Sequence, residues 1–240
     1  MTRPLARHSK GEIDPLVRPL FIQENCIEGN RIDLRQANVV AQYRPDVILF
    51  ELPAEKGNPS LIFNRYSPDK KPRREIWQKI RKAKIAGREF PYALSDVRVW
   101  ENIKELWRDG HDVLLFNIDG PDDLRRSYFN LTKGISYDLQ RKRLIFWVHC
   151  YLREIMMAEY VRNILRNYKK KENPIVAVFL QSIHWHHVKF LLKNPSQKEI
   201  WKYYFGRFPD VNPKNIGPKI GKIDTVHYKY WQKAPLGRVS

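Results

Sequence analysis

Polar side chains able to transfer protons or bind a metal ion stand at the ends of four apolar, strand-length segments of this chain. They are Glu24, Asn25 and Cys26 after the first segment, Glu51 in the second, Asp119 at the end of the third, and His184, His186 and His187 after the fourth. The carboxyl ends of parallel strands meet at one edge of a sheet, where ligands bind. Each group alone is commonly a turn former or a helix cap. Their coincidence at four strand ends predicts one site.

A second chemical feature is the Arg153-Glu154 pair, which lies inside the apolar, helix-like segment 151–165. A buried guanidinium is costly unless it is paired, and Glu51 is the partner expected in this architecture. An arginine placed in this way would clamp or polarise an anionic group beside a carboxylate. The alternative is an arginine stem packed along the helix with its guanidinium in solvent.

The pattern of apolar residues divides the chain into strands and helices that would position these groups. It predicts strands at 19–26, 47–52, 111–119 and 175–180. It predicts helices at 32–43, 95–109 and 144–168, a mostly helical stretch over 122–170, and a further helix beginning at 188. A strand, a helix and a strand in succession form the βαβ unit of a parallel sheet. We therefore expect an α/β fold with a mainly parallel central sheet flanked by helices.

The chain is expected to form one domain with two appendages. Residues 1–15 are polar and show no periodicity, which predicts a flexible N-terminal arm. Residues 16–195 hold all the predicted strands and are numerous enough to bury a core. Residues 196–240 contain several prolines and glycines among basic residues. This composition predicts an irregular basic C-terminal extension packed on the domain.

Composition favours a folded, cytoplasmic protein. Hydrophobic residues make up 42% of the chain and aromatic residues 12%, which argues against disorder. No apolar run approaches the roughly 18–20 residues that span a bilayer, and the first residues lack the apolar segment of a secretion signal. Cys26 and Cys150 are the only cysteines and have no Cys-x-x-Cys spacing. They predict neither a disulfide framework nor a structural zinc site.

The net charge of +18 is concentrated in the second half of the chain, where 121–240 carry 23 Lys and Arg against 9 Asp and Glu. Such an excess indicates either an anionic partner, nucleic acid or a membrane surface, or a solvated lysine-rich surface. A nucleic-acid-binding or scaffold protein is thus an alternative function, with phosphate contacts and base stacking from two basic segments. The residues concerned are Lys70, Lys71, Arg73, Arg74, Arg81, Lys82, Lys229 and Trp231.

Four segments in this order resemble the motifs of a known superfamily. They are Arg-Pro-Asp-Val-Ile-Leu-Phe-Glu-Leu-Pro (44–53), Gly-His-Asp-Val-Leu-Leu-Phe-Asn-Ile-Asp-Gly-Pro (110–121), Leu-Arg-Glu-Ile-Met-Met-Ala-Glu-Tyr-Val (152–161) and Val-Ala-Val-Phe-Leu-Gln-Ser-Ile-His (176–184). The superfamily comprises TraB/PrgY proteins, Tiki proteases, erythromycin esterases and ChaN-type haem-binding proteins, and the resemblance spans about residues 17–195. It implies hydrolysis of a small peptide or ester, with Glu51, Arg153, Glu154 and His184 as catalytic residues. Glu24, Asn25, Cys26, Asp119 and His187 are then expected to bind substrate.

The chain departs from the superfamily pattern at its first histidine. Cys26 stands where a Gly-x-x-His motif would place that histidine, and Gln181 replaces the glycine of the second such motif. Two chemistries remain open. Cys26 would be a ligand or nucleophile near His184, because a neighbouring imidazole lowers a thiol pKa. Alternatively, Glu24, Glu51 and His184 would hold a divalent metal ion such as Mn²⁺ or Zn²⁺ and leave a position for water.

Haem binding is a further alternative that the resemblance to ChaN-type proteins implies. In that case His184 or His186 would be the axial ligand of the haem iron. A Soret band that depends on His184 would distinguish this function from hydrolysis.

Overall fold

The computed structural model describes residues 18–24, 34–53, 97–167 and 174–238. The basic segment 70–88, together with Asn25 and Cys26, lies outside the described residues. The elements in chain order are β1 (Arg18–Glu24), α1 (Leu34–Tyr43), β2 (Val47–Pro53), α3 (Val97–Arg108), β3 (Leu114–Asp119), α4 (Asp122–Thr132), α5 (Tyr137–Arg141), α6 (Leu144–Asn167), β4 (Ile175–Gln181), α7 (Ser182–Leu192), α8 (Gln197–Phe205), α9 (Pro213–Ile223), α10 (Thr225–Trp231) and the 3₁₀ turn η2 (Pro235–Arg238).

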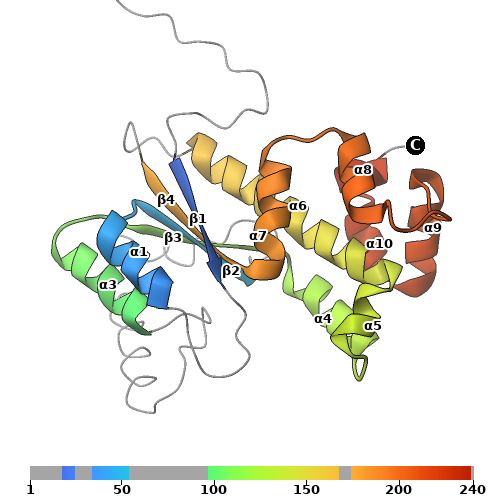
Figure 1. Ribbon diagram of the computed structural model, residues 1–240, viewed down its shortest axis with the longest axis horizontal. Helices are drawn as coiled ribbons and strands as arrows, with labels where there is room; N and C mark the ends of the chain where they lie inside the picture. The colour runs from blue at the N-terminus through green and yellow to red at the C-terminus, as the bar shows by residue number, and fades with distance from the viewer. Residues whose placement is uncertain (1–17, 25–33, 54–96, 168–173, 239–240) are drawn as a thin grey trace, which may run out of the picture.

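The four strands form one parallel sheet in the order β1-β4-β2-β3, and helices lie on both of its faces (Figure 1). Successive side chains of a strand point to opposite faces, so a strand buried on both sides has a continuous apolar sequence. In β2, Ile48 and Phe50 pack with residues of α1 and α3, whereas Val47 and Leu49 pack with residues of α6. The α/β fold predicted from the apolar runs is therefore confirmed.

Helix α6 is the central element of the second face. Its 24 residues contact β3, α7, α8 and α10, so it is covered by the sheet on one side and by the C-terminal helices on another. Tyr151, Val161 and Ala158 are fully buried. Because α6 is covered on several sides, it is apolar around most of its circumference. Its two charged residues, Arg153 and Glu154, therefore need buried partners.

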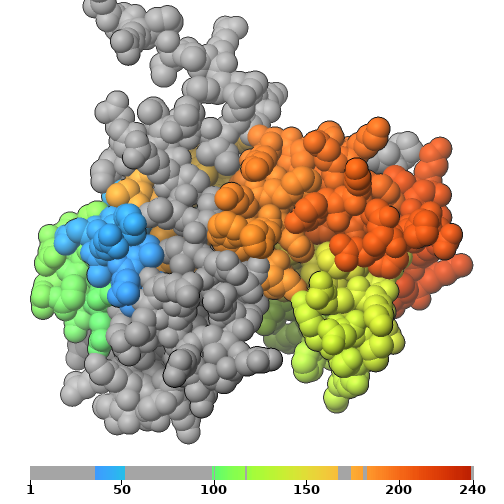
Figure 2. All heavy atoms as spheres, in the orientation of Figure 1, coloured from blue at the N-terminus to red at the C-terminus, as the bar shows by residue number. Residues whose placement is uncertain are grey.

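The C-terminal region is helical, and the predicted irregular extension is wrong in this respect. Ser196 and Asn212 each cap a helix reciprocally with the third residue of that helix, and Pro213 stands at the start of α9, where its missing N–H costs nothing. Proline and capping residues that suggested loops thus mark helix beginnings. Figure 2 shows these helices, coloured orange to red, continuous with the surface of α4 and α5. Among the described helices, none is long and apolar enough to cross a membrane.

Helix α3 ends at Arg108, and Gly110 just beyond it caps the helix. Gly110 has a φ of +79°, its N–H bonds to the carbonyl of Trp107, and the N–H of His111 bonds to the carbonyl of Leu106. This pair of bonds is the Schellman motif, which requires a left-handed residue at that position. The turn brings the chain from α3 directly into β3.

Replacing Gly110 with alanine is expected to lower the free energy of unfolding by about 1 kcal/mol, because a Cβ disfavours the left-handed conformation. Urea unfolding measures this change. Gly221→Ala in α9 is the matched control, because its Cβ would meet the ring of Tyr228 at an ordinary 3.5 Å and the position is helical. That control is expected to be neutral or slightly stabilising. An equal loss in both variants would contradict the assignment of a strained cap.

Candidate functional site

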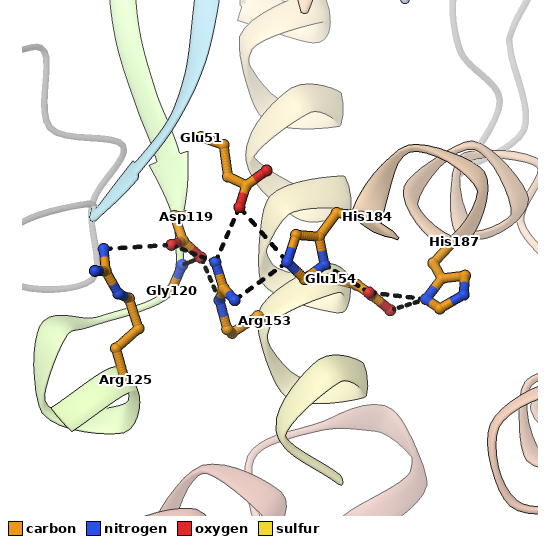
Figure 3. A network of polar contacts seen from close by, with 8 residues as sticks. All are labelled: Glu51, Asp119, Gly120, Arg125, Arg153, Glu154, His184 and His187. Carbon is orange, nitrogen blue, oxygen red and sulfur yellow. Dashed lines mark hydrogen bonds and ion pairs between the residues drawn. The ribbon is translucent and has the colours of Figure 1, made fainter. Parts of the chain in front are cut away.

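Arg153 is the centre of a buried polar cluster at the carboxyl edge of the sheet (Figure 3). Its Nε and Nη2 donate to the two carboxylate oxygens of Asp119 over 2.8 and 2.7 Å, and Nη2 also donates to Oε1 of Glu51 over 3.1 Å. Its Nη1 lies 3.1 Å from Nε2 of His184. The structure therefore brings together Glu51, Arg153 and His184, from β2, α6 and α7.

The partner that orients Arg153 is Asp119, and not Glu51 alone as the sequence suggested. Asp119 is the last residue of β3, is 1% exposed, and accepts both nitrogens of the planar guanidinium side by side. Its Oδ1 also accepts the N–H of Gly120 over 2.6 Å. A Cβ at Gly120 would lie 3.3 Å from Cγ of Arg153, so glycine lets the arginine approach the turn closely. Asp119 thus positions Arg153, and the substrate-binding role predicted for it stays a prediction.

Glu154 is fully buried and accepts hydrogen bonds from three side chains. These are Nδ1 of His184 at 2.7 Å, Nδ1 of His187 at 2.8 Å and the hydroxyl of Tyr204 at 2.6 Å. Burial acts to raise the pKa of Glu154, but the imidazoles of His187 and His184 outweigh it and hold that pKa below its ordinary value. Glu154 is therefore ionised, and the two histidines donate to it.

The hydrogen bonds assign the tautomer of His184. Because the ionised Glu154 accepts, Nδ1 of His184 carries a hydrogen and donates it. Nε2 is then a lone pair that accepts from Nη1 of Arg153 and lies 3.5 Å from Oε1 of Glu51. An imidazole held by a carboxylate through one nitrogen, with its other nitrogen basic, is suited to accept a proton.

Helix α7 begins earlier than the sequence predicted. It starts at Ser182, so the three histidines lie within it, and not before it. His184 and His187 are one turn apart and share a face, which lets both reach Glu154. His187 thereby becomes a partner of Glu154, whereas the sequence predicted substrate binding. His186 is exposed on another face of the helix.

Two residues of this site were missed by sequence reasoning. Tyr204 comes from α8, in a region expected to be irregular, and nothing in its spacing relates it to Glu154. Arg125 comes from α4 and approaches Asp119, with 3.8 Å between Nη1 and Oδ2. The sequence could have indicated Arg125, because this residue lies only six positions after the strand end at Asp119, in a segment whose first turn is acidic.

The predicted divalent-metal site is not formed by the described residues. Glu51 and His184 are close enough to share an ion, but the guanidinium of Arg153 hydrogen-bonds to both and occupies that position. Within the part of the chain that the structure describes, no group of three or more His, Cys, Asp or Glu side chains could hold a metal ion. The third predicted ligand, Glu24, ends β1 in register with Gln181, and its side chain lies outside the described residues. In the described cluster, Arg153 supplies the positive charge.

Some of the residues predicted for the two alternative functions, nucleic-acid binding and haem binding, are buried, already bonded or outside the described residues. Trp231 is 2% exposed and packs against Tyr151 and Phe205, so it has no face free for stacking on a base. Lys229 lies near the ring of Tyr230, and the six basic residues predicted between 70 and 82 lie outside the described residues. For the haem alternative, both ring nitrogens of His184 contact Arg153 and Glu154, whereas the other predicted axial ligand, His186, is exposed.

A pocket of about 640 Å³ lies beside the cluster and shares Arg153 with it. Its wall includes Arg125 and Tyr128 of α4 and His149 of α6. His149 and Arg153 are one helical turn apart, so their side chains lie on the same face of α6. Arg153 therefore belongs both to the cluster and to the wall of the pocket.

No protein-family model, curated protein or solved structure matches this chain. What the cluster does is therefore inferred from its own chemistry and from the resemblance of its sequence motifs. The four residues that the resemblance marks as catalytic, Glu51, Arg153, Glu154 and His184, all belong to this cluster.

Proposed function

We propose that this protein hydrolyses an ester or peptide bond, with His184 as general base and Arg153 stabilising the oxyanion. One observation carries the proposal: Nδ1 of His184 is held by the buried carboxylate of Glu154, while Nε2 lies within 3.1–3.5 Å of Arg153 and Glu51. A carboxylate-held imidazole beside a guanidinium combines proton transfer with charge stabilisation, which is what hydrolysis requires.

In the proposed reaction, Nη1 of Arg153 transfers its hydrogen bond from Nε2 of His184 to the carbonyl oxygen of the substrate. The freed Nε2 takes a proton from water as the water oxygen attacks the carbonyl carbon. The negative charge that develops on the carbonyl oxygen is offset by Arg153, whose orientation Asp119 fixes with two hydrogen bonds. Glu51 accepts from the same guanidinium and lies next to Nε2, where it would orient the water or the protonated imidazole. The proton then passes from His184 to the leaving group, so the imidazole returns to its starting state.

The resemblance to TraB, Tiki and erythromycin-esterase proteins supports the same chemistry. It implies catalytic roles for Glu51, Arg153, Glu154 and His184. The cluster gives Glu154 a more specific role than the resemblance does. Because Glu154 is fully buried and saturated with donors, it is a positioning residue that acts through His184. Cys26, which replaces the first motif histidine, has no part in the proposed mechanism.

Replacing His184 with asparagine is expected to lower kcat/KM for ester or peptide hydrolysis about 100-fold or more, because the base is lost. A panel of chromogenic acyl esters and fluorogenic peptides, assayed with purified full-length protein, measures this. His186→Asn is the matched control on the same helix, because His186 is exposed and is expected to leave the rate unchanged. Hydrolysis of no panel member above the His184→Asn background would contradict the proposed function.

A further inference from the structure

A second buried polar chain ends at the pocket and takes no part in the proposed hydrolysis. The hydroxyl of Ser127 donates to Oδ2 of Asp224 over 2.7 Å, and Asp224 also binds Nδ1 of His227. Nε2 of His227 lies 3.1 Å from Nδ1 of His149, which lines the pocket. The chain runs from α4 through α10 to α6, and both imidazoles are nearly or fully buried. A polar chain built into the core at this cost of desolvation needs an explanation.

This series of hydrogen-bonded side chains fixes which atom His149 presents to the pocket. Burial acts to raise the pKa of Asp224, but its hydrogen bonds from His227 and Ser127 hold that pKa low, so Asp224 is a carboxylate and accepts from Nδ1 of His227. Burial, opposed by Asp224, keeps the pKa of His227 below its ordinary value, so its Nε2 is a lone pair and accepts from Nδ1 of His149. Burial, and then Arg153, hold the pKa of His149 well below its ordinary value. Nε2 of a neutral His149 is therefore a hydrogen-bond acceptor.

That acceptor has no partner among the described residues. Nδ1 of His149 is used by His227, and Tyr128 stacks on the ring face with 4.1 Å between centroids. The hydroxyl of Tyr128 donates to Gln140, so it is not directed at His149. Nε2 is thus the ring nitrogen left for a ligand in the pocket. A ligand group that satisfies it must carry a hydrogen.

The other polar groups of the pocket wall are mainly cationic. Arg125 is 43% exposed, and its guanidinium makes no side-chain hydrogen bond to any described residue, since Asp119 lies 3.8 Å away. Lys133 is exposed at the same wall and has no ion pair within the described part of the chain. Of the remaining charges of the wall, Asp122 and Arg126 pair with each other at 2.6 Å, and Arg153 pairs with Asp119 and Glu51. Lys133, and Arg125 with its single long ion pair to Asp119 and its exposed guanidinium, favour an anionic ligand.

We propose that this pocket binds an oxyanion that also carries a hydroxyl group, with Arg125 and Lys133 on the anionic oxygens and Nε2 of His149 accepting from the hydroxyl. Hydrogen phosphate and a 2-hydroxycarboxylate share this chemistry. Sulfate carries the same charge as hydrogen phosphate, and acetate the same charge as a 2-hydroxycarboxylate, but neither has a hydroxyl hydrogen to donate to His149. The inference goes beyond hydrolysis and stands whether or not turnover is found. If both hold, the ester or peptide substrate carries such a group beside its scissile bond.

Isothermal titration of the full-length protein at pH 8 with inorganic phosphate, sulfate, lactate and acetate tests the inference without turnover. Phosphate is expected to bind about tenfold more tightly than sulfate, or lactate more tightly than acetate, because a hydrogen bond of ordinary strength is gained. A preference for phosphate over sulfate identifies the ligand group as a phosphate, and a preference for lactate over acetate identifies it as a 2-hydroxycarboxylate. Sulfate binding as tightly as phosphate, together with acetate binding as tightly as lactate, would overturn the proposal.

Two variants assign the binding to this pocket. His149→Phe keeps the ring that stacks on Tyr128 and removes the acceptor, so the preference for the hydroxylated anion is expected to disappear while anion binding persists. Arg125 is solvent-accessible, and Arg125→Gln is expected to weaken the binding of every anion about tenfold or more. Arg108→Gln on the exposed surface of α3 is the control and leaves binding unchanged. Anion binding that Arg125→Gln does not weaken would place the ligand elsewhere and refute the proposal.

Discussion

Replacing Arg153 with methionine is expected to lower the free energy of unfolding by about 3–5 kcal/mol at pH 7, one of the two largest effects we anticipate in this protein. Methionine fills much of the same volume, so the loss comes from charge and not from a cavity. It leaves the carboxylates of Asp119, 1% exposed, and Glu51, with a 4% exposed side chain, without the cation that now binds both. Two buried carboxylates facing each other are destabilised by desolvation and by repulsion.

Urea unfolding of the wild type and the variant at several pH values measures this effect. The loss is expected to diminish as pH falls, because protonation removes the charges of the two carboxylates that Arg153 no longer pairs. Arg126→Met is the matched control, since its ion pair with Asp122 is largely exposed and worth at most about 1 kcal/mol. Asp119→Asn in the Arg153→Met background is expected to restore part of the stability. Equal losses from Arg153→Met and Arg126→Met would show that the cluster is not a buried ion pair.

The framework of the fold could be predicted because its strands are buried on both faces. The buried part of a strand such as β2, here Val47 to Phe50, is apolar at every position, which makes it visible as a continuous run in the sequence. The first polar residue after such a run lies at the carboxyl edge of the sheet. The sequence pattern thus predicts Glu51 and Asp119 at one edge of the sheet and Arg153 on a helix that packs nearby.

What could not be predicted depends on distances between elements. The sequence predicts Glu51 as the partner of Arg153, whereas the two hydrogen bonds from Asp119 depend on the close approach that Gly120 permits. Tyr204 reaches Glu154 only because α8 packs on α6, and the prolines near α8 suggested a loop. Capping by Ser196 and Asn212 was the signal that would have predicted α8 and α9.

Helix α6 links both polar chains of the protein. Arg153 and Glu154 serve the cluster at the sheet edge, and His149, one turn before Arg153, ends the chain from Asp224. Because residues four positions apart on a helix are neighbours, one rigid element presents a basic nitrogen and a guanidinium to the same pocket. This arrangement accounts for buried polar residues in a helix that is otherwise largely apolar.

Replacing Glu154 with glutamine is expected to affect both stability and the proposed reaction. An amide has one acceptor oxygen, whereas Glu154 accepts from His184, His187 and Tyr204. At least one imidazole must therefore change its tautomer or lose its bond, with a cost of about 2–3 kcal/mol for hydrogen bonds to a charged group. If His184 changes, its Nε2 gains a hydrogen that faces the N–H of Arg153, and the base is lost. We expect kcat for the proposed hydrolysis to fall by as much as about 10⁴-fold.

The pH dependence separates this role from a mere packing effect. The pKa of Glu154 in the folded protein lies below its ordinary value, so its ionised form stabilises the fold at neutral pH and this contribution is lost as pH falls through the lowered pKa. The difference in unfolding free energy between wild type and Glu154→Gln is therefore expected to be complete at pH 7 and to shrink towards zero in acid. Tyr204→Phe, which removes one donor and leaves the carboxylate, is the control, with a loss of about 1 kcal/mol and an unchanged tautomer of His184. A difference between wild type and Glu154→Gln that stays constant down to strongly acidic pH would mean that Glu154 is not ionised in the fold, and His184 would then lack the acceptor that makes its Nε2 a base.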